Sequence, residues 1–470
     1  MSVLRSLLIL SFLLIAVDGM STTCAGTWTG AAGNVNWDNN PTLNWTPCIP
    51  GTGTNDSATF GDGPVITTIN LTDGVTPFSP QLQSLSFTST TMGYTINGPG
   101  SFTFIGTAPP TITVSGSQSH LIDAPIALGN DTTITVGSGT SLFLSNFAAV
   151  TGAQTLTVTG TGTLNTLVSS GSGVSPSTLI FQGGVNVSNM SGAVGMNDTI
   201  TISNAAIVNM ASGSFGTGST ITLSNGSVSN QVSALFGSMA TSIAIEGGTV
   251  TNTGSFGDTA TLISIDGGTV GNSNIFGPSA QMLLITNGVV NNNVGGNFGL
   301  GANNLLIRGG TVTNTGTTFG SGATAIAISG GTVANTSSGS FGDSSLSLLI
   351  SGGTVTNDGS GVFGHVSSGI TISGGTVTNG AGSFGQLAPI TISGGTVVNA
   401  IGDFATQAVS LTINGNSTVN NSNGGSFGVA ATSVTISGNC TINNTNGLGG
   451  GWFCFAAWLN NEYRWRHHQQ

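Results

Sequence analysis

The chain has 470 residues, of which only 4% are charged, and its formal net charge is −11. It contains four arginines and no lysine, so it lacks the basic patch that neutralises phosphates, and we exclude nucleic acid as a partner. Low charge with abundant Gly, Ser, Thr and Asn is also typical of disorder, but regularly spaced apolar pairs and a 38% hydrophobic content argue against it.

Residues 1–20 have the pattern of a secretory signal peptide. Arg5 supplies the positive start, and an apolar run follows from Leu7 to Val17. The run is short for a membrane span, although a retained anchor is the alternative. No later stretch is apolar enough to cross a bilayer as a helix, so we expect no transmembrane segment after signal cleavage.

The four cysteines fall into two local pairs. In the oxidising compartment that a signal peptide implies, Cys24 could form a disulfide with Cys48, and Cys440 with Cys454. Neither pair has the spacing of metal ligands, and the Asp-bearing nonapeptide of calcium-binding β-rolls is absent. We therefore expect neither a metal nor a cofactor.

Residues 21–84 are rich in Trp and in turn residues. Trp28, Trp37 and Trp45 are separated by Gly, Asn and Pro, which predicts short strands that cap the first coil of a β-structure. The motifs are Gly26-Thr-Trp28-Thr-Gly30, Asn36-Trp37, Asn44-Trp45, Pro50-Gly51 and Asp56-Ser-Ala-Thr-Phe60. Together with later strands, up to about residue 168, this segment resembles the start of bacterial autotransporter passengers and related surface adhesins.

Residues 85–194 alternate apolar and polar positions in short runs, such as Thr133-Ile-Thr-Val136, which predicts irregular β-coils. Residues 195–446 then repeat one pattern, whose clearest copy begins at Ile370. A Phe, followed by Gly in all but one copy, returns every 20 to 23 residues from Phe215 to Phe427. A period of this length predicts a solenoid, and its length favours a right-handed parallel β-helix of about 21-residue coils.

Each repeat predicts three inward columns. An aliphatic pair such as Ile243 and Ile245 comes first, then a Gly-rich turn, then an inward Val or Ile with an Asn two residues later. The Phe forms the third column. We expect the Asn residues to form an internal amide ladder, with αL turn chemistry as the competing explanation. The predicted ladder consists of Asn230, Asn252, Asn272, Asn292, Asn314, Asn335, Asn357, Asn379, Asn399, Asn421 and Asn444.

Residues 447–470 leave the pattern and form a divergent tail that either caps the last coil or is a scrambled end. An autotransporter passenger should lead into a β-barrel of amphipathic strands, and no such stretch follows in this sequence.

Two pairs of residues are candidate catalytic groups. Glu246 and Asp266 occupy the same position in adjacent repeats and could act as paired carboxylates on a glycan. Asp343 and His365 share another column. Exposed, variable turns explain both pairs more simply, and we expect no enzyme.

The expected function is therefore that of a secreted or bacterial cell-surface stalk or adhesin of the autotransporter-passenger type. Its partner would be a glycan or protein surface of a host or the environment. One alternative is an ice- or lattice-binding solenoid that uses outward Thr pairs such as Thr311 and Thr313, although that column breaks at Gly271, Ala334, Val398 and Asn420. The other alternative is a glycan-cleaving β-helix.

Overall fold

A computed structural model describes residues 23–37, 44–145, 154–167 and 177–445. Every regular element among them is a β-strand, and none of these residues lies in a helix. Every strand pair whose register is described is parallel, except β1 with β2, and one isolated antiparallel bridge joins Thr72 and Pro77. The predicted all-β parallel solenoid is thus confirmed, whereas its right-handed sense stays a prediction. The chain divides into two compact units, residues 1–164 and 165–470.

The first unit contains three parallel columns of strands. The first column runs through β1 (Ala25–Trp28), β3 (Ser57–Phe60), β6 (Ser84–Phe87), β9 (Thr111–Val114), β12 (Thr132–Val136) and β14 (Thr155–Gly160). The second runs through β4 (Thr68–Asn70), β7 (Thr95–Asn97), β10 (Ser119–Ile122) and β13 (Ser141–Leu144). The third consists of β5 (Gln81–Leu82), β8 (Phe102–Phe104) and β11 (Ile126–Leu128). Strand β2 (Trp45–Thr46) pairs antiparallel with β1, and β15 (Thr163–Leu167) spans the boundary with the second unit.

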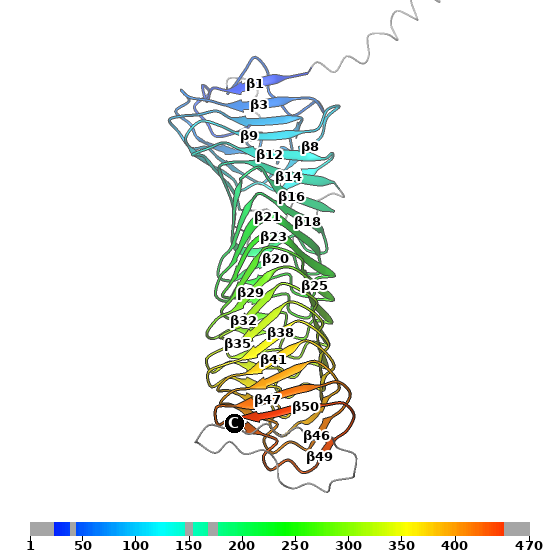
Figure 1. Ribbon diagram of the computed structural model, residues 1–470. Coiled ribbons are helices and arrows are strands. Elements are labelled where there is room, and N and C mark those ends of the chain that lie inside the picture. Colours follow the sequence, from blue (N-terminus) through cyan, green and yellow to red (C-terminus); the bar gives the residue numbers. More distant parts are fainter. Residues whose placement is uncertain (1–22, 38–43, 146–153, 168–176, 446–470) are drawn as a thin grey trace, which may run out of the picture. The chain divides into compact units, whose positions relative to one another are not determined.

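The second unit repeats a three-strand coil, and its strands stack in chain order (Figure 1). We name the three sheets by the residues that they bury.

The aliphatic-pair sheet consists of β16 (Thr178–Gln182), β18 (Thr199–Ser203), the first parts of β21 (Thr220–Asn230) and β23 (Ser242–Asn252), β25 (Leu262–Ile265), β28 (Met282–Ile285), β31 (Asn304–Ile307), β34 (Ala325–Ile328), β37 (Ser347–Ile350), β40 (Ile370–Ile372), β43 (Pro389–Ile392), β46 (Ser410–Ile413) and β49 (Val434–Ile436).

The ladder sheet consists of β17 (Asn186–Val194), β19 (Ala206–Asn209), the second parts of β21 and β23, β26 (Thr269–Asn272), β29 (Val289–Asn292), β32 (Thr311–Asn314), β35 (Thr332–Asn335), β38 (Thr354–Asn357), β41 (Thr376–Asn379), β44 (Thr396–Asn399), β47 (Thr418–Ser422) and β50 (Thr441–Thr445).

The Phe sheet consists of β20 (Gly213–Phe215), β22 (Leu235–Phe236), β24 (Ser255–Phe256), β27 (Ile275–Phe276), β30 (Asn297–Phe298), β33 (Thr318–Phe319), β36 (Ser340–Phe341), β39 (Val362–Phe363), β42 (Ser383–Phe384), β45 (Asp403–Phe404) and β48 (Ser426–Phe427).

Alternation along each strand explains this arrangement. In β34, for example, Ile326 and Ile328 are buried, and the residues between and before them are partly exposed, because successive side chains of a strand point to opposite faces. The same inward positions pair in register from coil to coil, so Ile326 lies between Leu305 and Leu348. A one-residue slip would turn every aliphatic pair outward, and this fixes the register.

The turn between the first two sheets requires glycine. Gly353 has a φ of 74°, and a Cβ there would lie 2.6 Å from the carbonyl oxygen of Gly331 in the preceding coil. Such a contact is too short for any side chain, so the Gly-Gly pair lets successive coils approach to the spacing of a parallel sheet.

Candidate functional site

The inward asparagines form a continuous hydrogen-bonded ladder. Each Nδ2 donates to the Oδ1 of the Asn in the next coil, at donor–acceptor distances of 2.7 to 2.9 Å. Apart from Asn444 in the last described coil, these side chains are at most 1% exposed. The ladder also contains Asn189 and Asn209, which the sequence analysis left out although each follows an inward Val or Ile by two residues.

The Asn side-chain amides also donate hydrogen bonds to backbone carbonyls of the turn that follows the ladder sheet. Asn292 Nδ2, for example, donates to the carbonyl oxygens of Gly296 in its own coil and Thr318 in the next one, at 3.1 and 2.8 Å. Buried amides that are fully hydrogen-bonded stabilise a unique packing, since each unmet group would carry a desolvation cost. The ladder is therefore committed to the interior and offers no group to a ligand.

The phenylalanines form a second internal column. From Phe215 to Phe427, neighbouring ring centroids are 4.6 to 5.1 Å apart and the rings are tilted by at most 10°. The residue after each Phe has a positive φ, which explains the Phe-Gly pair, and Ala405 takes the same conformation with a φ of 55°. The Phe column is likewise a core element.

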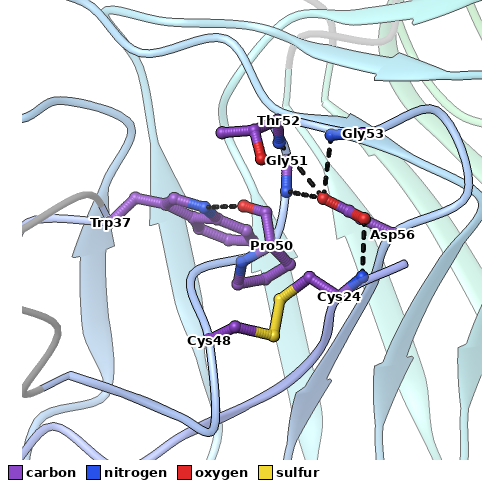
Figure 2. The surroundings of a disulfide bond; sticks show 8 residues. All are labelled: Cys24, Trp37, Cys48, Pro50, Gly51, Thr52, Gly53 and Asp56. Atoms are coloured by element: carbon purple, nitrogen blue, oxygen red, sulfur yellow. Dashed lines mark hydrogen bonds between the residues drawn. A yellow bond between two sulfur atoms is a disulfide. The ribbon is translucent and has the colours of Figure 1, made fainter. Parts of the chain in front are cut away.

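The start of the first unit is fixed by a disulfide and a buried carboxylate. Cys24 and Cys48 are bonded, and the backbone amides of Cys24, Gly51 and Gly53 donate to the carboxylate of Asp56 at 2.8 to 2.9 Å (Figure 2). Asp56 is 1% exposed, so these donors replace the water that its charge would otherwise bind. This geometry constrains the entry of the chain and keeps the carboxylate of Asp56 buried.

The three predicted Trp residues are buried in one aromatic cluster. Trp45 contacts both Trp28 and Trp37, and all three rings contact Phe60, with centroid separations of 4.6 to 6.2 Å. Each indole Nε1 donates to a backbone carbonyl, and Figure 2 shows the bond from Trp37 to Pro50. The indoles therefore act as packing groups with satisfied polar tips and do not form an exposed sugar-binding platform.

His120 is a buried titratable group that the sequence analysis missed. Its ring stacks against Phe87 and Tyr94, and its Nδ1 accepts a hydrogen bond from the backbone amide of Tyr94. Its Nε2 has no hydrogen-bond partner, and burial lowers the pKa of the imidazole to about 4. The ring is thus neutral near pH 7, and only its place in the alternation of β10, between Ser119 and Leu121, could have indicated that it points inward.

The first pair of catalytic candidates lies on an exposed turn edge. Glu246 and Asp266 occupy adjacent coils, as predicted, and both are exposed. Asp266 accepts hydrogen bonds from the Thr286 hydroxyl and from Asn287 Nδ2. The Asp266 carboxylate is thus held by neighbouring side chains at an exposed position of the turn.

The second pair does meet in the structure. His365 Nδ1 lies 3.2 Å from Asp343 Oδ1, and both side chains are about one third exposed, at 33% and 32%. Equivalent positions in neighbouring coils carry Asp258, Leu300 and Gln386. The described residues contain no group of three or more His, Cys, Asp or Glu side chains that could hold a metal ion. An exposed pair of this kind contributes little to stability.

The exterior of the ladder sheet carries a regular column of Thr, of which the outward Thr pairs predicted from the sequence are a part. The first outward position of ten consecutive coils is Thr in all but one, and these residues stack in register: Thr249, Thr269, Val289, Thr311, Thr332, Thr354, Thr376, Thr396, Thr418 and Thr441. The predicted breaks at Gly271, Ala334, Val398 and Asn420 lie in a second column, two residues further along each strand.

These outward threonines keep their hydroxyls available. No Thr of the first column forms a side-chain hydrogen bond within the described part of the chain, in contrast to the saturated Asn ladder behind it. From Thr311 to Val398 the two columns carry only Thr, Ala and Val. Methyl groups and hydroxyls therefore repeat along an uncharged part of the sheet surface. The spacing along the axis is that of a sheet, about 4.8 Å.

No family model, curated protein or solved structure matches the chain. No helix long and apolar enough to cross a membrane is found in the described residues.

Proposed function

We propose that the chain is a non-catalytic β-solenoid, secreted or displayed on a cell surface, that acts as a stalk or adhesin of the autotransporter-passenger type. The observation that carries the proposal is the division of each coil into repeating inward columns and variable turns. Aliphatic, Asn and Phe columns fill the interior of the described coils between Phe215 and Phe427. Such an array propagates coil by coil into an extended body with long side faces, which suits contact with glycan or protein surfaces.

The variable turns between the ladder Asn and the Phe are the contact sites that we favour. Three of them expose an apolar side chain, Val232 at 63%, Val294 at 82% and Ile401 at 59%. Isolated apolar residues on a surface with few charges are suited to weak, repeated contacts, in which many coils contribute through multivalency.

A matched pair of triple variants tests this proposal. We expect Val232→Ser, Val294→Ser and Ile401→Ser together to reduce binding of the purified protein to cells and to a glycan array. The control removes equally exposed apolar residues from the turn that follows the Phe, namely Met239, Leu346 and Val409. Adhesion through the favoured turns is refuted if the wild-type protein binds neither cells nor glycans, or if the control lowers binding as much as the test variant.

The threonine columns favour a second candidate function, binding to a regular lattice such as ice. Repeating methyl and hydroxyl groups can order water or match a periodic surface, and the first column supplies them over ten coils with one interruption, at Val289. We expect Thr354→Lys with Thr376→Lys to abolish any thermal hysteresis of the purified protein. Thr371→Lys with Thr391→Lys, on the exterior of the aliphatic-pair sheet, is the control. Absence of hysteresis at high protein concentration eliminates this candidate.

A further inference from the structure

The exterior of the aliphatic-pair sheet carries a run of apolar side chains on five successive strands, from β25 to β37. The central outward position of this sheet is Thr on both sides of the run, at Thr222 and at Thr371, and all positions between them pair in register. The apolar patch consists of the six outward residues Leu262, Met282, Leu284, Leu306, Ala327 and Leu349. None of the six is buried, and Met282 is 37% exposed.

Neither the core nor strand propensity accounts for the apolar patch. Its side chains point away from the interior, because each occupies an outward position next to a buried Ile or Leu. Thr is favoured at partly exposed strand positions and Ala is depleted in strands, yet Ala327 stands here between Leu306 and Leu349. Apolar groups that adjoin one another on an exposed surface are typical of a site that another molecule covers.

Three charged side chains lie on the turn at one edge of this sheet. Glu246, Asp266 and Arg308 each follow the last buried residue of a strand, and all three are exposed. Arg308 is the only Lys or Arg among the described residues, and it forms no ion pair with any of them. It lies two coils from Asp266, about 10 Å at the strand spacing of a sheet, so the opposite charges of this edge are separated within one chain.

We propose that a second copy of this chain covers the apolar patch, in a dimer whose two-fold axis runs along strand β28. An axis in this direction reverses the order of the coils in the partner and keeps the two charged edges on the same side. Leu284 then lies opposite Leu284 of the partner subunit. Arg308, one coil after β28, lies opposite the partner's Asp266, one coil before it, and the symmetry forms this ion pair twice.

The charge pattern favours a second copy over other occupants of the apolar patch. Acids that precede β28 and a base that follows it are matched when the same edge meets itself in reverse order, and complementary charges of this kind fix the register of an interface. An anionic lipid surface attracts clusters of basic residues, and this edge has a single one among its described residues.

The size of the apolar patch determines the strength of the dimer. Five coils of four-residue strands measure roughly 20 Å by 13 Å, so each copy contributes roughly 260 Å². A standard stable interface buries about 800 Å² per partner. We therefore expect a weak dimer that forms as the protein concentration rises. The proposal does not rest on adhesion or lattice binding, because the patch lies outside both the favoured turns and the ladder-sheet exterior.

Sedimentation equilibrium of the purified full chain over a wide concentration range tests the apolar contact. We expect a reversible monomer–dimer equilibrium in the wild type, and a dissociation constant at least about tenfold higher in a Leu284→Ser, Leu306→Ser variant. The control is Val289→Ser with Val398→Ser, which removes outward apolar side chains from the ladder sheet and leaves the equilibrium unchanged. Circular dichroism checks that both variants keep the strand content of the wild type.

A mixing experiment tests the ion pairs. An Arg308→Glu chain has only acids among the three edge positions, and a Glu246→Arg, Asp266→Arg chain has only bases. We expect each chain alone to dimerise more weakly than the wild type, because like charges then face each other. An equimolar mixture of the two is expected to recover the dimer, since Glu at position 308 then faces Arg at position 266 across the interface. A general loss of stability would not be reversed by mixing.

Four results would overturn the proposal. The wild type would stay monomeric at every concentration, or the Leu variant and its control would dimerise equally well. The mixture would associate no more strongly than its two components. A monomeric wild type whose binding to neutral lipid vesicles or to a glycan array falls in the Leu variant would assign the apolar patch to that other occupant.

Discussion

The Asn ladder permits a direct comparison of two neighbouring asparagines in strand β29. Asn292 points inward and is 0% exposed, whereas Asn291 points outward and is partly exposed. Substitution of either one by Ala removes the same carboxamide group from the same strand. We expect Asn292→Ala to destabilise the local coils strongly and Asn291→Ala to have an effect within about 0.5 kcal/mol of zero.

The magnitude follows from the bonds that Asn292 forms. Its Nδ2 donates to Gly296, Asn314 and Thr318, and its Oδ1 accepts from Asn272. Removing the side chain leaves the Oδ1 of Asn314 buried without its donor, which costs about 1–3 kcal/mol, and each lost net hydrogen bond adds about 1 kcal/mol. Partial relaxation of the neighbours reduces the sum, so we expect about 2–4 kcal/mol.

Hydrogen exchange is the appropriate assay, because the stability of a repeat array is a sum of nearly local terms. A local loss of about 2–4 kcal/mol predicts roughly 30- to 700-fold faster exchange in β26, β29 and β32, at 1.4 kcal/mol for each factor of ten. Coils far along the array, such as the one that contains Phe384, should change little. If Asn292→Ala and Asn291→Ala accelerated exchange equally, the ladder would not stabilise the coil and the argument would be wrong.

The remaining predictions concern the other columns and the first unit. Phe319→Leu should destabilise its coil by about 1–3 kcal/mol, because it leaves a gap between two stacked rings, and denaturant unfolding measures this. Ala405→Gly should stabilise by about 1 kcal/mol, since only Gly takes a φ of 55° without cost; no gain in midpoint would contradict the strain argument. The pKa of His120 is lowered to about 4 in the folded state from 6.5, so its contribution to stability is complete above pH 6.5 and is lost as the pH falls toward 4. We expect the first unit to lose about 2 kcal/mol between pH 7 and 4.5, and His120→Phe to remove most of this slope, as measured by urea unfolding at both pH values.

The inward columns could be predicted from the sequence because each depends on one residue type at a fixed spacing. Asn314 and Phe319 return once per coil, and alternation assigns both to the interior. The structure nevertheless adds Asn189 and Asn209 to the ladder. Both lie before Phe215, the first Phe of the regular Phe column, so the spacing of the Phe residues did not indicate them. When the repeat is measured on one column of residues, coils that lack the residue of that column are not counted.

The corner after the Phe could not be predicted, because its residues vary while its backbone does not. The third residue after each Phe has a positive φ whether it is Gly322, Ser344, Val366 or Leu387. A β-branched residue such as Val366 is disfavoured in this conformation, so its identity gave no indication of it. The coil imposes the conformation through a repeated backbone bond, in which the amide of Val366 donates to the carbonyl of Gln386 in the next coil. Local preference is overruled here by the periodic hydrogen bonding of the neighbours.

The first unit shows a similar limit. Turn residues and Trp spacing predicted short strands around Trp28 and Trp45, and the structure pairs these two as strands β1 and β2. The stacking of His120 on Phe87 had no counterpart in the sequence pattern, because the contact joins residues 33 positions apart across two strand columns. Contacts of this kind depend on register, which alternation alone does not provide.

The outward threonines pose a separate problem, because no requirement of the core explains them. High β-propensity favours Thr on any partly exposed strand. In the same ten coils, however, the matching first outward position of the aliphatic-pair sheet is never Thr, and residues such as Leu262, Met282 and Asn304 stand there. Turn chemistry is also insufficient, since the Thr hydroxyls of the first column form no bond to the preceding turn. Propensity acts on both sheets equally, so the difference between them indicates a role specific to the ladder-sheet exterior. Lysine substitutions on the two faces compare the same change on matched strands, and a difference in binding that appears on one face alone would locate that role.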